Sequence, residues 1–153
     1  MELYVKKFSE LTVDELYQLL RLRAEVFVVE QGCPYVDPDD RDRDAIHIWL
    51  QDGDGIQAYL RLMAEGVESE YPSIGRVIAV RRRCGLGSRV VAEAIRIAQE
   101  VYHPKGIYLE SQVYARSLYE KLGFRQTSDE FLIDGIPHIA MLFDCIAPDT
   151  RIG

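Results

Sequence analysis

A strand, a basic turn and a helix follow one another between residues 74 and 101, and this unit constrains the fold more than any other part of the sequence. Residues 74–80 are rich in β-branched side chains, which is typical of a strand inside a sheet. The turn after them contains three arginines, Arg81 to Arg83, and two glycines, Gly85 and Gly87. Apolar residues at helical spacing then predict an amphipathic helix: Val90, Val91, Ala94, Ile97, Ala98 and Val101. This order favours an α/β fold.

The turn has the composition of an anion-binding site. Gly85 and Gly87 permit positive φ and a close approach of the backbone, and the free amides and dipole at a helix start favour a negative charge. The arginines can add charge-assisted hydrogen bonds. A dinucleotide-binding loop would need glycine at Val90, and no Lys-Ser/Thr pair follows as in a P-loop. The turn therefore predicts a pyrophosphate site of another kind; the alternative is a glycine turn with three solvated arginines.

The remaining elements alternate between strands and helices without a repeat or a linker. Thr12 and Glu15 have the spacing of a capping box and predict a helix that Gly32 and Pro34 end. We expect strands at 3–5, 46–51, 56–65, 74–80, 107–112, 124–133 and 136–143, and later helices at 89–101 and 115–122. This order predicts a mixed, mostly antiparallel central sheet flanked by helices, in a single domain over residues 1–153.

Composition excludes several classes of function. With 18 Lys and Arg against 25 Asp and Glu, the formal net charge is −7, which argues against a general nucleic-acid or membrane-surface binder. Cys33, Cys84 and Cys145 are too widely spaced for a zinc site or a disulfide framework, so we expect no metal. The first ten residues have no apolar stretch typical of a signal peptide, and no run of residues suits a membrane span. We expect a cytoplasmic protein.

A second motif, Leu118-Tyr119 followed by Gly123-Phe124, helps to interpret the basic turn of residues 81–88. Together with Arg82-x-x-Gly85-x-Gly87, it resembles the GCN5-related N-acetyltransferase (GNAT) superfamily, and the resemblance covers nearly the whole chain. Three further segments are similar to the ElaA-like branch of that superfamily: 27–37, 75–77 and 134–139.

The resemblance implies acetyl-CoA-dependent acyl transfer to an amine, with CoA as product and the GNAT fold as scaffold. The backbone of the strand ending at Val80 would pair with the pantetheine arm, amides of the turn would hold the pyrophosphate, and the sheet would splay between Ile78 and Leu109 to admit the thioester. The implied CoA-binding residues are Ile78, Ala79, Val80, Arg82, Arg83, Cys84, Gly85, Leu86, Gly87, Ser88, Gln112 and Tyr119.

By the same resemblance, Tyr119 is the general acid near the CoA sulfur. Full proton transfer from a tyrosine to a thiolate is uphill by about 2 kcal/mol, so Tyr119 is best pictured as a donor that yields its proton as the C–S bond breaks. Glu110 is the candidate base, with an exposed or ion-paired strand carboxylate as the alternative. His138, the third candidate catalytic residue, is a candidate group of the acceptor pocket, with a structural histidine as the alternative. Gln112 stands where the superfamily often has asparagine.

The amine pocket is expected around the loop after the first helix. Glu30, Gln31 and Tyr35 could recognise a cationic amine there, with His47 as a further pocket residue. The alternatives are a loop that only packs and a structural histidine. The acidic stretch 37–44 lacks the glycine of a calcium-binding EF-hand loop, so we expect a solvated loop or an electrostatic attractor of amines.

Other functions stay open at this point. A non-catalytic acyl-CoA-binding sensor or interaction module on the same fold is the main alternative to an enzyme, and nucleotide binding is a weaker one. A covalent route through Cys33 would need a His–Asp pair that the sequence does not identify. We expect a monomer or a homodimer, and the sequence does not indicate which amine is the acceptor or whether acyl groups other than acetyl are used.

Overall fold

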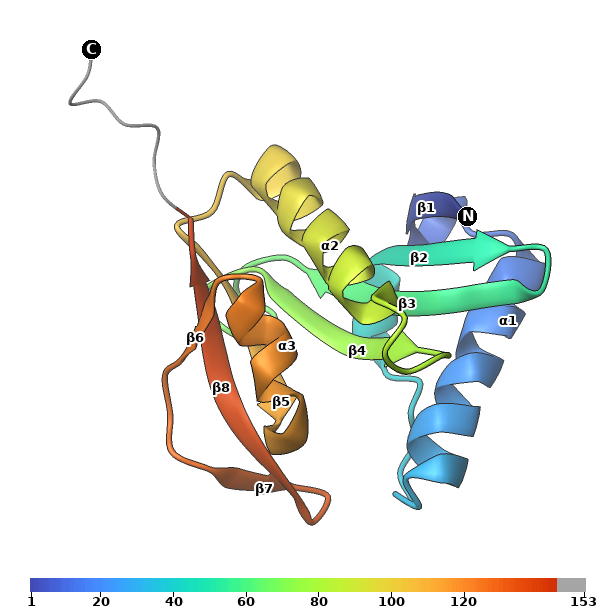
Figure 1. Cartoon of the computed structure of the whole chain (residues 1–153). Coiled ribbons are helices and arrows are strands. Elements are labelled where there is room, and N and C mark those ends of the chain that lie inside the picture. Colours follow the sequence, from blue (N-terminus) through green and yellow to red (C-terminus); the bar gives the residue numbers. More distant parts are fainter. Residues whose placement is uncertain (146–153) are drawn as a thin grey trace.

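The computed structural model describes residues 1–145, and an eight-stranded sheet with the order β1-β2-β3-β4-β5-β8-β6 forms its centre, with β7 also pairing β8 (Figure 1). Neighbouring strands are antiparallel except β4 and β5, which are parallel. The mixed, mostly antiparallel sheet is thereby confirmed. The strands are β1 Glu2–Lys7, β2 Ile46–Asp52, β3 Gly55–Met63, β4 Ser73–Ala79, β5 Gly106–Gln112, β6 Phe124–Gln126, β7 Phe131–Ile133 and β8 Ile136–Asp144.

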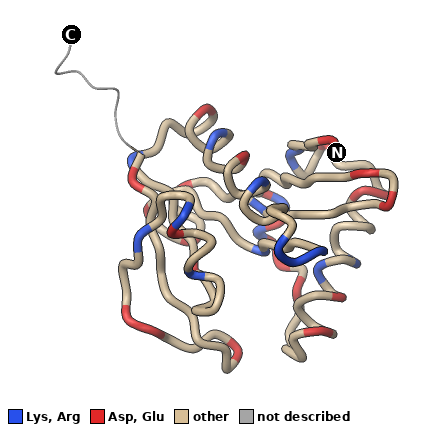
Figure 2. The backbone as a smooth tube through the Cα atoms, viewed as in Figure 1, with Lys and Arg blue, Asp and Glu red and all other residues tan. Residues whose placement is uncertain are grey.

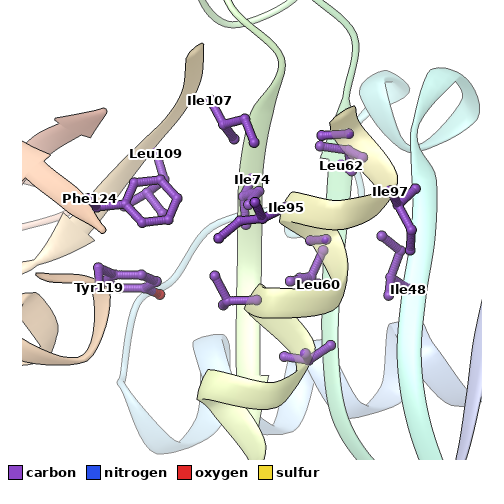
Figure 3. Packing of buried hydrophobic residues seen from close by; sticks show 14 of the residues in the cluster. Ile48, Leu60, Leu62, Ile74, Ile95, Ile97, Ile107, Leu109, Tyr119 and Phe124 are labelled. Carbon is purple, nitrogen blue, oxygen red and sulfur yellow. The ribbon is translucent and has the colours of Figure 1, made fainter. Parts of the chain in front are cut away.

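Helices cover both faces of the sheet. Side chains alternate between the two faces along a strand, so Ile48 and Leu60 pack with the apolar side of α2, whereas Trp49 and Tyr59 pack with α1. Figure 3 shows the α2 side of this core. The helices are α1 Val13–Arg23, α2 Leu86–Tyr102 and α3 Arg116–Lys121, a π-helix η2 Ala24–Glu30 and short 3-10 helices at Phe8–Glu10, Asp40–Asp44 and Val113–Ala115. No helix in residues 1–145 is long and apolar enough to cross a membrane.

The first helix begins as its sequence indicates. The Glu15 amide donates to the Thr12 hydroxyl (3.0 Å) and the Thr12 amide donates to the Glu15 carboxylate (2.9 Å), so the capping box is confirmed. The helix then continues into η2, and Gly32, with φ +65°, follows its end. This π-helical extension carries the chain to one wall of the site described below.

The sheet opens between β4 and β5. The two strands pair only at Ser73 with Tyr108 and at Ile74 with Leu109, although both run on in the same direction. On its other side β4 bulges: Arg76 and Val77 lie opposite a single residue of β3, and Arg76 has φ +53°. The expected splay of the sheet is confirmed, and the bulge in β4 lies where the opening begins.

The C-terminal hairpin differs from the prediction in one respect. We expected one strand over 124–133, but the structure divides it into β6 and β7. The interruption has a specific cause, because the Ser128 hydroxyl accepts a hydrogen bond from the Ala140 amide (2.9 Å) and so replaces a ladder carbonyl. Both short strands still pair with β8.

Candidate active site

The basic turn between β4 and α2 presents backbone amides and arginines to solvent. Gly85 caps α2 with φ +74°, and Arg83 also has a positive φ of 60°. No side chain of the described residues caps the first turn of α2, so its amides remain open to a ligand. Arg81, Arg82 and Arg83 are all exposed, and Figure 2 shows them as a block of positive charge on this turn. The arrangement suits an anion.

Gly87 does not have the conformation that we expected. Its φ is not positive, because Gly87 lies within α2. Glycine is needed at this position because a side chain would crowd neighbouring residues. A Cβ atom there would lie 3.2 Å from Leu118 Cδ1 and 3.8 Å from Ala79 Cβ. Gly87 therefore lets α2 approach α3 and the end of β4, which positions the turn over the opening of the sheet.

One edge of β4 is free at this end of the sheet. The Val80 amide donates to the Gln57 carbonyl of β3 (2.9 Å). Because the polar backbone groups of successive residues in a strand point to opposite edges, those of Ala79 point away from β3. Ile78 is buried, Ala79 is half-buried and Val80 is exposed, so the free edge runs from the cleft toward the basic turn.

A cavity of about 230 Å³ occupies the opening between the strands. Its walls come from the bulge of β4, the end of β5, the start of α3, the β7–β8 hairpin and the loop after η2. Six residues singled out in the sequence line it together: Gln31, Tyr35, Glu110, Gln112, Tyr119 and His138. Residues more than 100 positions apart thus meet in one cleft.

Tyr119 lies on α3, and its side chain is held in the wall of the cavity. The ring packs edge-on against Phe124 with centroids 5.9 Å apart, and only 8% of the residue is exposed (Figure 3). Burial raises the pKa of Tyr119 well above its ordinary value, with the nearby Tyr114 hydroxyl acting in the same direction. A tyrosine hydroxyl is a hydrogen-bond donor at neutral pH in any case, and the raised pKa means that Tyr119 yields its proton less readily than an exposed tyrosine.

His138 has a defined tautomer. Its Nδ1 lies 2.7 Å from the Ile136 carbonyl oxygen. A carbonyl only accepts, so Nδ1 carries the proton and a neutral ring keeps its lone pair on Nε2. The ring also stacks on Phe131, with centroids 6.4 Å apart. His138 lines the cavity, and Nε2 is the atom through which its neutral ring could accept a proton.

The outward face of β5 carries the other polar groups of this wall. Leu109 is buried, and Glu110 and Gln112 point to the opposite face as the alternation predicts. Gln112 pairs with His138 across the ladder, so their side chains share a face. Glu110 is exposed and accepts a hydrogen bond from the Tyr108 hydroxyl (3.2 Å).

Glu30 and His47 do not line the cavity. His47 is fully buried, with Nδ1 2.7 Å from the Tyr59 hydroxyl and Nε2 2.9 Å from the Asp42 carbonyl oxygen. Burial lowers the pKa of His47 and favours the neutral ring. Both nitrogens are used within the protein, so His47 is a structural histidine and has no free atom for an acceptor.

The acidic stretch is a solvated loop only in part: Asp40 and Asp44 are exposed, but for Asp37 and Asp42 the expectation was wrong. Asp37 and Asp42 are buried, where Arg23 donates to both carboxylates (Nε–Oδ2 2.8 Å and Nη1–Oδ1 2.7 Å). Although burial acts in the opposite direction, Arg23 and Arg61 hold the pKa of Asp42 below its usual value. The signal in the sequence was Arg23 itself, a charged residue at a core position of an amphipathic helix.

The geometry gives little support for a cysteine nucleophile or for a metal site. Cys33 lines the cavity but its thiol contacts only the Gln31 carbonyl oxygen (3.7 Å) among the described residues. Cys84 is exposed in the basic turn. Residues 1–145 contain no group of three or more His, Cys, Asp or Glu side chains that could hold a metal ion.

Comparison with known proteins gives a consistent result. A family described as "Acetyltransferase (GNAT) domain" matches residues 76–145. Protein ElaA of Escherichia coli is 37% identical over 142 residues, which cover 90% of this chain and 93% of that protein. The crystal structure of E. coli ElaA and that of an acyl-CoA N-acyltransferase from Pseudomonas aeruginosa each superpose with a TM-score of 0.87 at 35% identity, over 94% of this chain and 99% of theirs. The chain belongs to the ElaA-like branch of the GNAT superfamily.

Proposed function

We propose that residues 1–153 form a single N-acetyltransferase domain that transfers the acetyl group of acetyl-CoA to a primary amine by direct attack. One observation carries the proposal: β4 and β5 part beyond Ile74 and Leu109, and Tyr119 lines the cavity in this opening. The similarity to an acyl-CoA N-acyltransferase from Pseudomonas aeruginosa supports an acyl-CoA as the donor.

The basic turn and the free edge of β4 suit the donor. Arg82, Arg83 and the amides from Cys84 to Ser88 would hold the diphosphate, since α2 begins without a side-chain cap. The polar backbone groups of Ala79 would pair with the pantetheine amides, in the manner of an added strand. Along this path the thioester would reach the cavity beside Gln112 and Tyr119.

In the chemical step, the amine nitrogen would form a bond to the thioester carbon as the carbon–sulfur bond breaks. Tyr119 would donate its proton to the leaving sulfur, and His138 Nε2 would take one proton from the amine, directly or through water. Glu110 is the alternative base, but its carboxylate is exposed and already accepts from Tyr108. The products would be an N-acetylamine and free CoA thiol.

A CoA-thiol release assay over a panel of amines and peptides tests this function. We expect thiol release that depends on one class of amine and falls in a Tyr119→Phe variant. Acetyl-CoA binding without thiol release for any acceptor would instead support the non-catalytic sensor on the same fold. Thiol release without any added amine would contradict direct transfer to an amine.

A further inference from the structure

Asp37 lies where separate parts of the cleft wall meet. Its carboxylate accepts hydrogen bonds from Arg23 Nε (2.8 Å), Arg76 Nε (2.8 Å) and the Tyr35 hydroxyl (3.1 Å). Its backbone carbonyl accepts two more, from Arg23 Nη2 (3.1 Å) and Arg76 Nη2 (3.2 Å). Each arginine therefore holds Asp37 through two nitrogen atoms. Asp37 is 2% exposed and does not itself line the cavity.

The three partners of Asp37 come from different elements. Arg23 is the last residue of α1, and Arg76 is in the bulge of β4. Tyr35 belongs to the loop of residues 31–37, which lines one side of the cavity. The Arg76 guanidinium also lies 5.5 Å from the centroid of the Tyr35 ring. Tyr35 and Arg76 donate to the same carboxylate oxygen of Asp37, Oδ1, and both residues line the cavity.

Arg76 is in an unfavourable backbone conformation. A residue other than glycine is strained at φ +53°, and it persists in this conformation only where its surroundings hold it. Two hydrogen bonds to Asp37, an ion pair with Asp39 (Nη2–Oδ2 3.6 Å) and the packing against Tyr35 hold its side chain. The shape of the bulge, and with it the start of the opening between β4 and β5, thus depends on the loop.

We propose that Asp37 is a positioning residue. It belongs to the 31–37 loop and bonds Tyr35 within it, and its bonds to Arg76 fix this loop relative to the β4 bulge. The loop forms the wall expected to receive the amine, and the bulge borders the path of the thioester. Asp37 therefore sets the distance between the two reactants without touching either of them. The catalytic consequence rests on the proposed function, whereas the coupling of loop and bulge does not.

The charges around Asp37 determine which variant tests the proposal. Three arginines face three aspartates in this network: Arg23, Arg61 and Arg76 against Asp37, Asp39 and Asp42. Asp37→Asn would leave a buried arginine partly uncompensated and can unfold the chain. Arg76 is the better target, because its side chain is 23% exposed and both bonds of Arg23 to Asp37 remain.

The test compares Arg76→Gln with Arg125→Gln. Arg125 makes a similar two-nitrogen contact with Asp144 (2.6 and 3.2 Å), but on the exposed surface of β6 and β8. Hydrogen exchange of the amides of residues 31–37 is measured first, then KM for the amine and Kd for acetyl-CoA. In Arg76→Gln we expect the exchange rate of these amides and the KM for the amine each to rise about tenfold. The Kd for acetyl-CoA should stay within about twofold of the wild-type value. We expect no change in Arg125→Gln.

A second variant separates positioning from a general loss of structure. Tyr35→Phe removes only the hydroxyl bond to Asp37 and should raise the amine KM by a smaller factor. Because both side chains act through Asp37, the double variant should raise KM by less than the product of the two single effects. Independent, multiplicative effects would contradict the proposal.

The outcomes distinguish this inference from the proposed function. Unchanged exchange of residues 31–37 in a folded Arg76→Gln variant would overturn the inference whatever the enzyme's activity. Raised exchange with an unchanged amine KM would overturn the positioning role. If the wild-type chain acetylated no amine, the proposed function would fail, and the exchange measurement would still decide whether Asp37 couples loop and bulge.

Discussion

The side-chain amide of Gln112 donates a hydrogen bond to the side-chain oxygen of Gln31 at 3.3 Å, across 81 positions of sequence. Gln31 follows η2, and Gln112 ends β5. This bond joins the 31–37 loop to the cavity wall that contains Glu110 and His138. The side-chain amides of Gln31 and Gln112 therefore bridge the cleft at one point. Both residues line the cavity where we propose that acyl transfer takes place.

Replacing Tyr119 by phenylalanine should remove the proton donor and keep the ring. We expect kcat to fall by about 100-fold or more, the usual contribution of a general acid, with the Kd for acetyl-CoA unchanged. Steady-state kinetics and calorimetry measure the two effects. Tyr114→Phe, which alters an exposed tyrosine of the same cavity, is the control. Undiminished turnover in Tyr119→Phe would reject the acid role.

Alkaline pH should destabilise the fold through Tyr119. Burial raises its pKa in the folded state, so the stabilisation is complete below the unfolded tyrosine's pKa of about 10 and is lost as pH rises through the folded value. Tyr59, whose pKa burial also raises, adds to the loss. Urea unfolding from pH 8 to about 11 should show a shallower decline in Tyr119→Phe than in the wild type. Parallel curves would contradict the raised pKa.

Replacing His138 by glutamine should remove the proposed base. We expect kcat to fall by about 10- to 100-fold, because the amine must then lose its proton to water. The control is His103→Asn, an exposed histidine at the end of α2 whose φ of 46° asparagine tolerates. If Glu110→Gln slows the reaction and His138→Gln does not, the base is Glu110.

The double variant Arg82→Gln, Arg83→Gln should weaken donor binding alone. Losing two exposed charge-assisted contacts should raise the Kd for acetyl-CoA about tenfold, and the wild-type affinity should fall with added salt. The rate at saturating acetyl-CoA should stay the same. Arg96→Gln on the exposed face of α2 is the control. An unchanged Kd would place the diphosphate elsewhere.

Replacing Cys33 by alanine separates direct attack from a covalent route. The thiol lines the cavity, but its one contact is a backbone carbonyl oxygen, and no general base of the described residues holds it. We expect Cys33→Ala to turn over within about twofold of the wild type. Loss of activity, together with an acetylated enzyme in mass spectra of the wild type, would support an acyl-cysteine intermediate.

Local patterns predicted most of the fold. The capping box of Thr12 and Glu15, the apolar stripe of α2 as far as Ala98 and the strand β2 each depend on neighbours in sequence, and the structure has all three. Val101, the last residue of the expected stripe, is exposed. The strand break at Ser128 could not be predicted, because it depends on a hydroxyl that reaches a distant strand. Sequence spacing contains no information on that contact.

Only Arg23, a charged residue at a core position of its helix, indicated in the sequence that the acidic residues have buried partners. Asp37 and Asp42 have the composition of a solvated loop, and their burial depends on arginines from α1, β3 and β4. The same burial of charge explains why His47 is structural: its ring faces this network and not the cleft. By contrast, Tyr119 and His138 could be singled out from the sequence, because the first lies in a motif that resembles the superfamily and the second in one that resembles its ElaA-like branch, and both line the cavity.

Titration of acetyl-CoA into the wild-type protein by calorimetry tests the central claim most directly. We predict saturable binding with one molecule per chain, and competition by free CoA, which has the same diphosphate and pantetheine arm. Absence of any saturable heat up to millimolar acetyl-CoA would contradict the account, because neither the basic turn nor the open edge of β4 would then serve an acyl donor.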